Sequence, residues 1–200
     1  MKIAVIGSGN VGGALGAAWV KAGHQVTFGS RNPSGDKPVP GSSVTDVKSA
    51  IENAEAVALA IPFTAVAEVT KQIPDWKNKV LIDCTNPLGP GLALSLGFNT
   101  SAGEQVATQA KGARVVKAFN TTGFKNMENP KYGGRGVTMF YATDDSSAAD
   151  VAELLVRDVG FEPQFAGPLK QARYLEPLAA LWISLGPRLG LEFAITIAKR

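Results

Sequence analysis

The chain has 200 residues, 45% hydrophobic and 18% charged, and 20 basic against 17 acidic residues give it a net charge of +3. It is long enough to bury one sizeable core, and its scattered basic residues are too few to predict a nucleic-acid partner. One cysteine, one histidine and no apolar run of membrane-spanning length predict a cytoplasmic protein with no disulfide, metal site or membrane partner.

The first 31 residues have the pattern of a β-α-β unit. Lys2–Ile6 is an apolar run typical of a buried parallel strand, and it leads directly into the G-x-G-x-x-G sequence of residues 7–12. Apolar residues then recur at helical spacing up to Gly23, and Gln25–Phe28 predicts a second strand. Glycines at this spacing let the backbone approach a pyrophosphate, which a helix N-terminus also attracts. The motif therefore predicts a dinucleotide site.

The end of the second predicted strand indicates which dinucleotide binds. NAD-binding folds usually have a carboxylate there for the ribose 2′-hydroxyl. This chain has Gly29-Ser30-Arg31-Asn32 instead, and no Asp or Glu before Asp36. A hydroxyl beside a guanidinium suits a 2′-phosphate, so we expect NADP(H), to which Lys37 could add a positive charge. The alternative is that Arg31 is a solvated loop residue.

The rest of the chain alternates between apolar strands and amphipathic helices, with three loops between them, of which the last two are long. This order predicts an α/β fold, a doubly wound and mostly parallel Rossmann sheet over residues 1–168. The predicted strands are Ala56–Ile61, Val80–Asp83, Val115–Phe119, Val137–Thr143 and Pro163–Ala166, the helices Asp46–Asn53 (capped by Thr45), Thr64–Gln72 and Ser146–Val159, and the loops Asn32–Ser43, Pro87–Thr100 and Thr121–Gly136.

Residues 169–200 are expected to form a separate helical segment. Apolar residues follow helical spacing from Leu175 to Leu185, Pro187 is predicted to break the helix, and a second apolar stretch covers Leu189–Ala198. So apolar a segment must be buried, either on its own domain or, as we favour, against a second copy in a homodimer.

Ligands of doubly wound sheets bind at the carboxyl ends of the strands. Here those ends are followed by residues 7–12, 61–63, 85–88 and 120–123. We expect the first loop to bind pyrophosphate and the others to enclose the nicotinamide and its hydride acceptor. Asn86 and Asn120 could bind the carboxamide or be ordinary turn residues. The candidate rings for stacking on an acceptor, each equally explained by packing, are Phe98, Phe124 and Tyr132.

The chain has few candidates for acid–base chemistry. His24 precedes the second strand, at the wrong end of the sheet, and Cys84 is most simply a small residue at a strand end. Lys117, next to the expected site, is the remaining candidate base. We therefore expect no catalytic side chain, which suits an acceptor that takes hydride directly, such as a flavin or deazaflavin.

Several segments together resemble a known family. Lys2–Gly12, Gly23–Val26, Gly29–Pro33, Asp83–Pro87 and Val116–Thr121 are similar to the NADPH:coenzyme F-420 oxidoreductase-like family and to the cytosolic NADPH domain of STEAP-type metalloreductases. The likeness extends through Ala166–Leu169 and Ala172–Glu176. At Phe119-Asn120 the chain departs from the deazaflavin enzymes, which have His-Thr there, and is closer to the metalloreductases.

The resemblance implies a homodimer that exchanges hydride between NADP(H) and a deazaflavin of the F-420 type, FMN or FAD. It implies NADP(H) binding by Ser8, Asn10, Val11, Ser30 and Arg31, with the nicotinamide near Ile61, Pro62, Asn86 and Ala118–Asn120. Two alternatives stay open, a non-catalytic NADP(H)-sensing protein and an NADPH-dependent imine or carbonyl reductase in which Lys117 takes part. In all, the expected cofactor-binding residues are Gly7, Ser8, Gly9, Asn10, Val11, Gly12, Ser30, Arg31, Asn32, Ile61, Pro62, Phe63, Asn86, Pro87, Ala118, Phe119 and Asn120.

Overall fold

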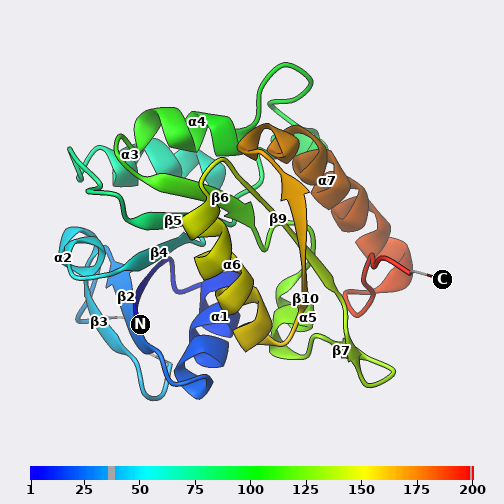
Figure 1. Cartoon of the computed structure of the whole chain (residues 1–200), viewed down its shortest axis with the longest axis horizontal. Helices are drawn as coiled ribbons and strands as arrows, with labels where there is room; N and C mark the ends of the chain where they lie inside the picture. Colours follow the sequence, from blue (N-terminus) through cyan, green and yellow to red (C-terminus); the bar gives the residue numbers. More distant parts are fainter. Residues whose placement is uncertain (36–38, 199) are drawn as a thin grey trace.

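The computed structural model describes residues 1–35, 39–198 and 200. In this part of the chain an eight-stranded sheet has the order β10-β9-β6-β5-β4-β1-β2-β3 (Figure 1). Lys37 lies outside the described residues. The strands of the sheet are β1 (Lys2–Ile6), β2 (Gln25–Ser30), β3 (Ser43–Asp46), β4 (Ala56–Leu59), β5 (Val80–Asp83), β6 (Arg114–Ala118), β9 (Thr138–Thr143) and β10 (Glu162–Gly167).

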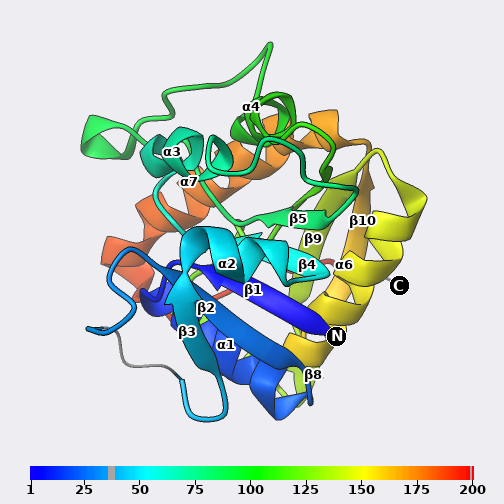
Figure 2. The same ribbon diagram turned by 90° about the vertical axis from the view of Figure 1, so that its left-hand side faces the viewer.

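Helices cover both faces of this sheet (Figure 2). On one face, α1 and α6 pack around Leu15, Trp19 and Leu155, while on the other α2, α3 and α4 pack around Ile51 and Val106. The predicted doubly wound, mostly parallel sheet is therefore confirmed. The helices are α1 (Asn10–Lys21), α2 (Val47–Glu52), α3 (Val66–Thr70), α4 (Ala102–Gln109), α5 (Phe124–Glu128), α6 (Ser146–Val159) and α7 (Ala172–Leu189).

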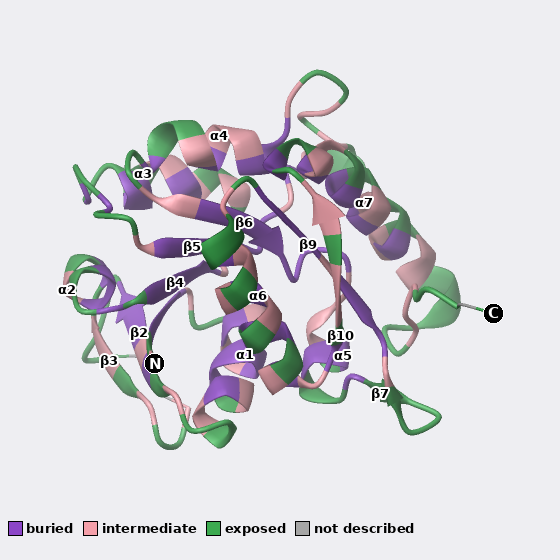
Figure 3. Ribbon diagram, viewed as in Figure 1, coloured by how far each residue is buried: buried purple, intermediate pink, exposed green. Residues whose placement is uncertain are grey.

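The central strands are buried on both faces (Figure 3). Their residues are almost all aliphatic, as expected for parallel strands covered by helices on either side. β1 pairs with β2 and β4 in parallel, with Ile6 beside Gly29 and Leu59, so the three strands end at one edge of the sheet. That edge carries the glycine-rich loop and is the edge expected to bind a ligand.

The last two strands run against the others. β9 pairs antiparallel with β6, with Val116 opposite Thr143, and β10 is parallel to β9. The start of β9 at Thr138 therefore lies at the same edge as the ends of β1 to β6. Within the described residues, no helix has both the length and the apolar character needed to cross a membrane.

Two predicted boundaries on the β2 side are wrong in detail. The loop expected to reach Ser43 ends earlier, because Ser43–Asp46 pairs with the end of β2 as an edge strand. The following helix, α2, is capped by Asp46 rather than Thr45, since the Asp46 carboxylate accepts the Ser49 N–H at 2.9 Å. A carboxylate at this position also interacts favourably with the positive end of the helix dipole.

Two other predictions were too coarse. The expected helix Thr64–Gln72 is divided into a 3-10 turn, Phe63–Ala65, and α3. The loop predicted over residues 121–136 contains α5 and a small hairpin of β7 (Lys131–Tyr132) and β8 (Arg135–Gly136). These elements are too short to show a clear hydrophobic period.

The C-terminal helix continues past the proline expected to break it. α7 contains both Pro177 and Pro187 and ends at Leu189. Pro187 lies in the last turn, so the hydrogen bond that it cannot donate is lost close to the end of the helix. The chain then returns to its own domain, where the Phe193 ring stacks on Trp182 with centroids 4.9 Å apart. The Phe193 carbonyl accepts the Trp182 indole N–H at 2.9 Å and the Asn126 amide at 2.7 Å.

Candidate functional site

The glycine-rich loop between β1 and α1 has the geometry of an anion cradle. Gly7 has a φ of +106°, and a Cβ on Gly12 would lie 1.9 Å from the Gly7 oxygen, so the helix can approach the strand only without a side chain there. Gly9 precedes α1 without a side-chain cap, and its missing Cβ would face open space. The first N–H groups of α1 are thus directed toward an uncovered space, which suits a phosphate.

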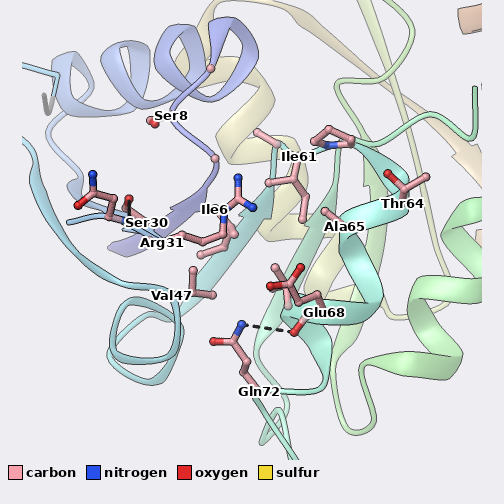
Figure 4. A pocket seen from close by; sticks show the side chains of 17 residues that line it. Ile6, Ser8, Ser30, Arg31, Val47, Ile61, Thr64, Ala65, Glu68 and Gln72 are labelled. Atoms are coloured by element: carbon pink, nitrogen blue, oxygen red, sulfur yellow. Dashed lines mark hydrogen bonds between the residues drawn. The ribbon is translucent and has the colours of Figure 1, made fainter. Parts of the chain in front are cut away.

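A cavity of about 570 Å³ extends from this loop (Figure 4). The ends of β1 and β2 form one wall, and the loop after β4 together with α3 forms the other. Its volume is within the range that cofactors occupy. Of the expected cofactor-binding residues, it brings together Gly7, Ser8, Gly9, Ser30, Arg31, Asn32, Ile61 and Pro62.

The segment after β2 supplies the polar groups of this cavity. Ser30 is buried, and its hydroxyl accepts the Asn32 N–H at 2.8 Å. Arg31 is exposed and lies beside Ile6 in the cavity. Among the described lining residues, Glu68 is the sole carboxylate, and it comes from α3 rather than from the end of β2. A 2′-phosphate beside Ser30 and Arg31 would therefore meet donors and a positive charge.

A second cavity of about 260 Å³ shares Gly9, Ile61 and Pro62 with the first. It adds the N-terminus of α1, Phe63 and the loop after β5, and so brings in the expected residues Asn10, Val11 and Asn86. Cys84 lines it too, but burial raises the pKa of this thiol, which keeps it protonated and unreactive. The second cavity lies where the sequence predicts the nicotinamide end.

Asn86 and Asn120 form a reciprocal pair between the loops after β5 and β6. The Asn120 amide donates to the Asn86 side-chain oxygen at 3.1 Å, and the Asn86 amide donates to the Asn120 carbonyl at 3.0 Å. The Asn120 amide also donates to the Leu175 carbonyl on α7. Within the described chain, the buried Asn120 Oδ1 and Thr85 Oγ1 have no hydrogen-bond partner. Buried polar atoms of this kind are unusual. Thr85 lines the smaller cavity, whereas the expected Asn120 lines neither cavity and reaches the site only through Asn86.

The remaining expected residues do not line either cavity. Phe119 has a φ of +61°, which turns its ring into the core, edge-on to Trp19 at 5.8 Å. Ala118 is fully buried in β6, and Pro87 is buried with its carbonyl accepting both Ser95 donors. Gly12 lies inside α1 against Gly7. Any contact of the Phe119 segment with a cofactor must therefore come from its backbone.

Lys117 belongs to a buried ionic cluster. Its Nζ lies 2.9 Å from Asp83 Oδ2, 2.9 Å from Glu176 Oε1 and 2.6 Å from the Thr85 carbonyl, and its side chain is 0% exposed. Burial lowers the pKa of Lys117, but the two carboxylates more than compensate and raise it. The amine therefore stays charged and out of reach of either cavity. The sequence did not predict this cluster, because Glu176 lies 59 positions further along the chain.

The other singled-out side chains serve packing or structure. His24 lies at the opposite edge of the sheet, with Nε2 2.7 Å from Asp158 and Nδ1 3.2 Å from the amine of Met1. The Tyr132 hydroxyl donates to Asn126, and Phe124 packs partly against the core. Phe98 is 97% exposed on the loop after β5. Within the described residues, none of these three rings lines either cavity.

Glu68 and Gln72 are residues of the large cavity that sequence reasoning missed. They lie near α3, one helical turn apart, and only their place after the β4 loop could have drawn attention to them. Polar residues on a surface helix are normally read as a solvated face.

Comparison with known proteins is consistent with this geometry. The family profile "NADP oxidoreductase coenzyme F-420-dependent" matches residues 2–87. The chain is 27% identical over 180 residues to metalloreductase STEAP3 of Rattus norvegicus and 31% identical over 148 residues to a glycerol-3-phosphate dehydrogenase (NAD(P)+) of Thermoanaerobacter sp.. These matches cover 88% and 66% of this chain but only 36% and 41% of the two proteins, so the chain spans well under half of either relative.

Two solved structures extend the comparison to the whole fold. A reductive aminase from Aspergillus terreus in complex with NADPH has a TM-score of 0.70 at 20% identity, covering 94% of this chain and 62% of its own, which shows the shared fold alone. A candidate F-420-dependent NADP reductase from Arthrobacter sp. FB24 has a TM-score of 0.88 at 30% identity, with both chains covered over 100% of their lengths. With the family profile over the nucleotide-binding half, this full-length match shows that the chain belongs to the coenzyme F-420-dependent NADP oxidoreductase family.

Proposed function

We propose that the protein passes hydride between NADPH and a deazaflavin coenzyme of the F-420 type or a flavin such as FMN or FAD. One observation carries the proposal. The glycine cradle, Ser30 and Arg31 line a cavity that continues into the smaller one at the ends of β4 and β5. Among the described residues that line the smaller cavity, where the nicotinamide is expected, Cys84 is the one ionisable side chain, and burial raises its pKa. An acceptor that takes hydride without a proton from the protein suits such a site.

The residues of the chain would hold NADP(H) along this path. The first N–H groups of α1 and the loop of residues 7–12 would bind the pyrophosphate, and Ser30, Arg31 and Asn32 the 2′-phosphate. Ile61, Pro62 and Phe63 would pack against the nicotinamide end, and the Asn86–Asn120 pair would orient it. NADPH supplies, when bound, a hydride on its nicotinamide ring. The protein's part is to align the two rings and exclude water.

The two side chains that could serve as acid–base groups in another kind of reductase, Lys117 and Cys84, are not available for proton transfer. Lys117 is charged, fully buried and engaged with three acceptors, so an imine or carbonyl reductase that relies on it is disfavoured. Cys84 is held as a neutral thiol by burial, which raises its pKa. A direct hydride acceptor therefore fits better than a carbonyl that needs protonation.

Stopped-flow absorbance at the NADPH band tests the proposal. The purified protein is mixed with NADPH and, separately, with F-420, FMN or FAD, and loss of the band with one of these acceptors is expected. If NADPH binds but none of these acceptors is reduced, the proposed hydride transfer to a deazaflavin or flavin fails.

We further propose that the protein works as a homodimer in the cytoplasm. α7 exposes Tyr174, Leu181 and Leu189 by 73%, 53% and 57%, and a second copy of the chain would cover these side chains. The single cysteine suits a reducing compartment. Sedimentation equilibrium should give twice the chain mass, and Leu181→Lys should shift it to the monomer.

A further inference from the structure

Three polar side chains on the α3 side of the large cavity, those of Thr64, Glu68 and Gln72, are not explained by the phosphate-binding motif. Glu68 and Gln72 project from the α3 side, across the cavity from Ser30 and Arg31 (Figure 4). The nearby lining from Val47, Ala65 and Val69 is apolar and suits the faces of a flat ring. Glu68 and Gln72 are therefore two groups on this wall that could distinguish one ring from another by hydrogen bonding.

Both side chains can present acceptors to the cavity. The Gln72 amide nitrogen donates to the Glu68 backbone oxygen at 3.3 Å, which positions the Gln72 side chain and leaves its oxygen as an acceptor. The Glu68 carboxylate, when ionised, is an acceptor only. A ring with an amino group at its edge would satisfy the Glu68 carboxylate, whereas a ring with a carbonyl at the same position would bring two acceptors together there.

The expected position of the adenine base of NADP(H) follows from the cofactor site proposed above, on which this inference rests. With the pyrophosphate on the glycine cradle and the 2′-phosphate at Arg31, the base on the same ribose must occupy the remaining space toward α3. We propose that Glu68, supported by Gln72, selects adenine by accepting a hydrogen bond from its amino group. The planar guanidinium of Arg31 can stack on one face of the same ring.

A carboxylate in a cavity for an anionic cofactor has a second explanation. Glu68 could simply repel the 2′-phosphate, in which case it would weaken binding whatever the base. The two explanations predict opposite effects of removing its charge. Under base selection, Glu68→Gln weakens binding of the adenine cofactor and improves binding of the hypoxanthine analogue, because the new amide can donate to a carbonyl. Under simple repulsion, Glu68→Gln tightens binding of both.

Calorimetric titration with NADPH and with its hypoxanthine analogue, with no acceptor present, separates these outcomes. The protein should bind NADPH about 10-fold more tightly than the analogue, the effect of one charge-assisted hydrogen bond. Glu68→Gln should remove most of this preference. Glu128→Gln, the same change on the exposed surface of α5, should keep it. Glu68 is itself exposed, so its substitution should leave the fold intact.

Two results would overturn the inference. One is equal affinity of the unaltered protein for NADPH and the analogue, and the other is tighter binding of both to Glu68→Gln. Either leaves the NADP(H) site standing, because NADPH still binds. A protein that does not bind NADPH at all would remove both the inference and the proposed function.

Discussion

The Lys117 ammonium group lies 2.9 Å from the Glu176 carboxylate, and neither side chain is exposed by more than 1%. The contact joins β6 to α7 through the interior of the protein. Glu176 also accepts the N–H groups of Ala102 at 2.9 Å and Gly103 at 3.1 Å, so the same carboxylate caps α4. The buried Lys117–Glu176 pair thus connects the sheet, α7 and α4.

Replacing Lys117 by methionine should strongly destabilise the protein. The change fills the same volume but leaves the Asp83 and Glu176 carboxylates without their cation, which costs about 3–5 kcal/mol for a buried charge. Urea unfolding followed by circular dichroism measures the loss. Lys125→Met, which breaks an exposed pair with Glu128, is the matched control and should cost no more than about 1 kcal/mol. Similar losses for the two variants would contradict the buried cluster.

The same cluster predicts a loss of stability at alkaline pH. The folded protein raises the pKa of Lys117 above its ordinary value of 10.5. A raised pKa means that the stabilisation is fully present below the unfolded value and is lost as pH rises through the folded value. The difference in unfolding free energy between the unaltered protein and Lys117→Met should therefore shrink only above pH 10.5. Shrinkage already at neutral pH would contradict this assignment.

Arg31→Ala should weaken NADPH binding much more than NADH binding. The guanidinium is expected to bind the 2′-phosphate, and losing a charge-assisted contact of this kind costs roughly 10- to 100-fold in affinity. Fluorescence titration with both cofactors gives the ratio. Arg135→Ala, on the exposed hairpin, removes the same charge outside the cavity and should leave the ratio unchanged. An equal loss for NADPH and NADH would remove the role of Arg31 in cofactor choice.

Two adjacent glycines of α1 should respond in opposite ways to alanine. A Cβ on Gly12 meets the Gly7 oxygen at 1.9 Å, so Gly12→Ala must move the loop, lowering both the melting temperature and NADPH affinity. At Gly13 a Cβ has no neighbour within 4 Å, and alanine there should stabilise the helix by about 0.5–1 kcal/mol. Calorimetric melting of the two variants compares them directly. A stable, NADPH-binding Gly12→Ala would contradict the close contact.

Removal of residues 191–200 should loosen the packing around Trp182. The indole N–H and the Asn126 amide both lose the Phe193 carbonyl, and the loss of these two hydrogen bonds costs about 1–3 kcal/mol. Tryptophan emission should shift to longer wavelength as the ring gains contact with water. Phe193→Ala keeps the carbonyl and loses only the ring stack, so its cost should be smaller, about 0.5–1.5 kcal/mol. An unchanged emission spectrum would show that the tail does not cover Trp182.

The sequence was most informative where structure is local. The first strand, the glycine loop and the Ser146–Val159 helix follow from short-range periodicity and glycine spacing, and the structure has them at the predicted places. The edge strand Ser43–Asp46 was missed because its residues alternate too little, and only pairing with β2 makes it a strand. The residues expected to bind the cofactor phosphates could be identified from the sequence, because the glycine motif sets their positions relative to one strand and one helix.

Contacts between distant parts of the chain were beyond such reasoning. Phe119 was expected near the nicotinamide, yet a positive φ, which no sequence pattern marks, turns its ring toward Trp19. The approach of Lys117 to Glu176 depends on how α7 packs, and the place of Glu68 depends on how α3 follows β4. A side chain that reaches a site from a distant helix or strand can be identified only once the packing of the elements is known.

The capping of α4 by Glu176 means that the last helix is not a removable appendage. Cutting the chain before α7 would remove Glu176, the acceptor of two α4 N–H groups. It would also leave Asp83 and Lys117 beside the space that Glu176 fills. The polypeptide should consequently melt in one cooperative step, with no surviving nucleotide-binding fragment. Replacing the C-terminal helix by another would therefore also require new residues in place of Asp83 and Lys117 in the central strands.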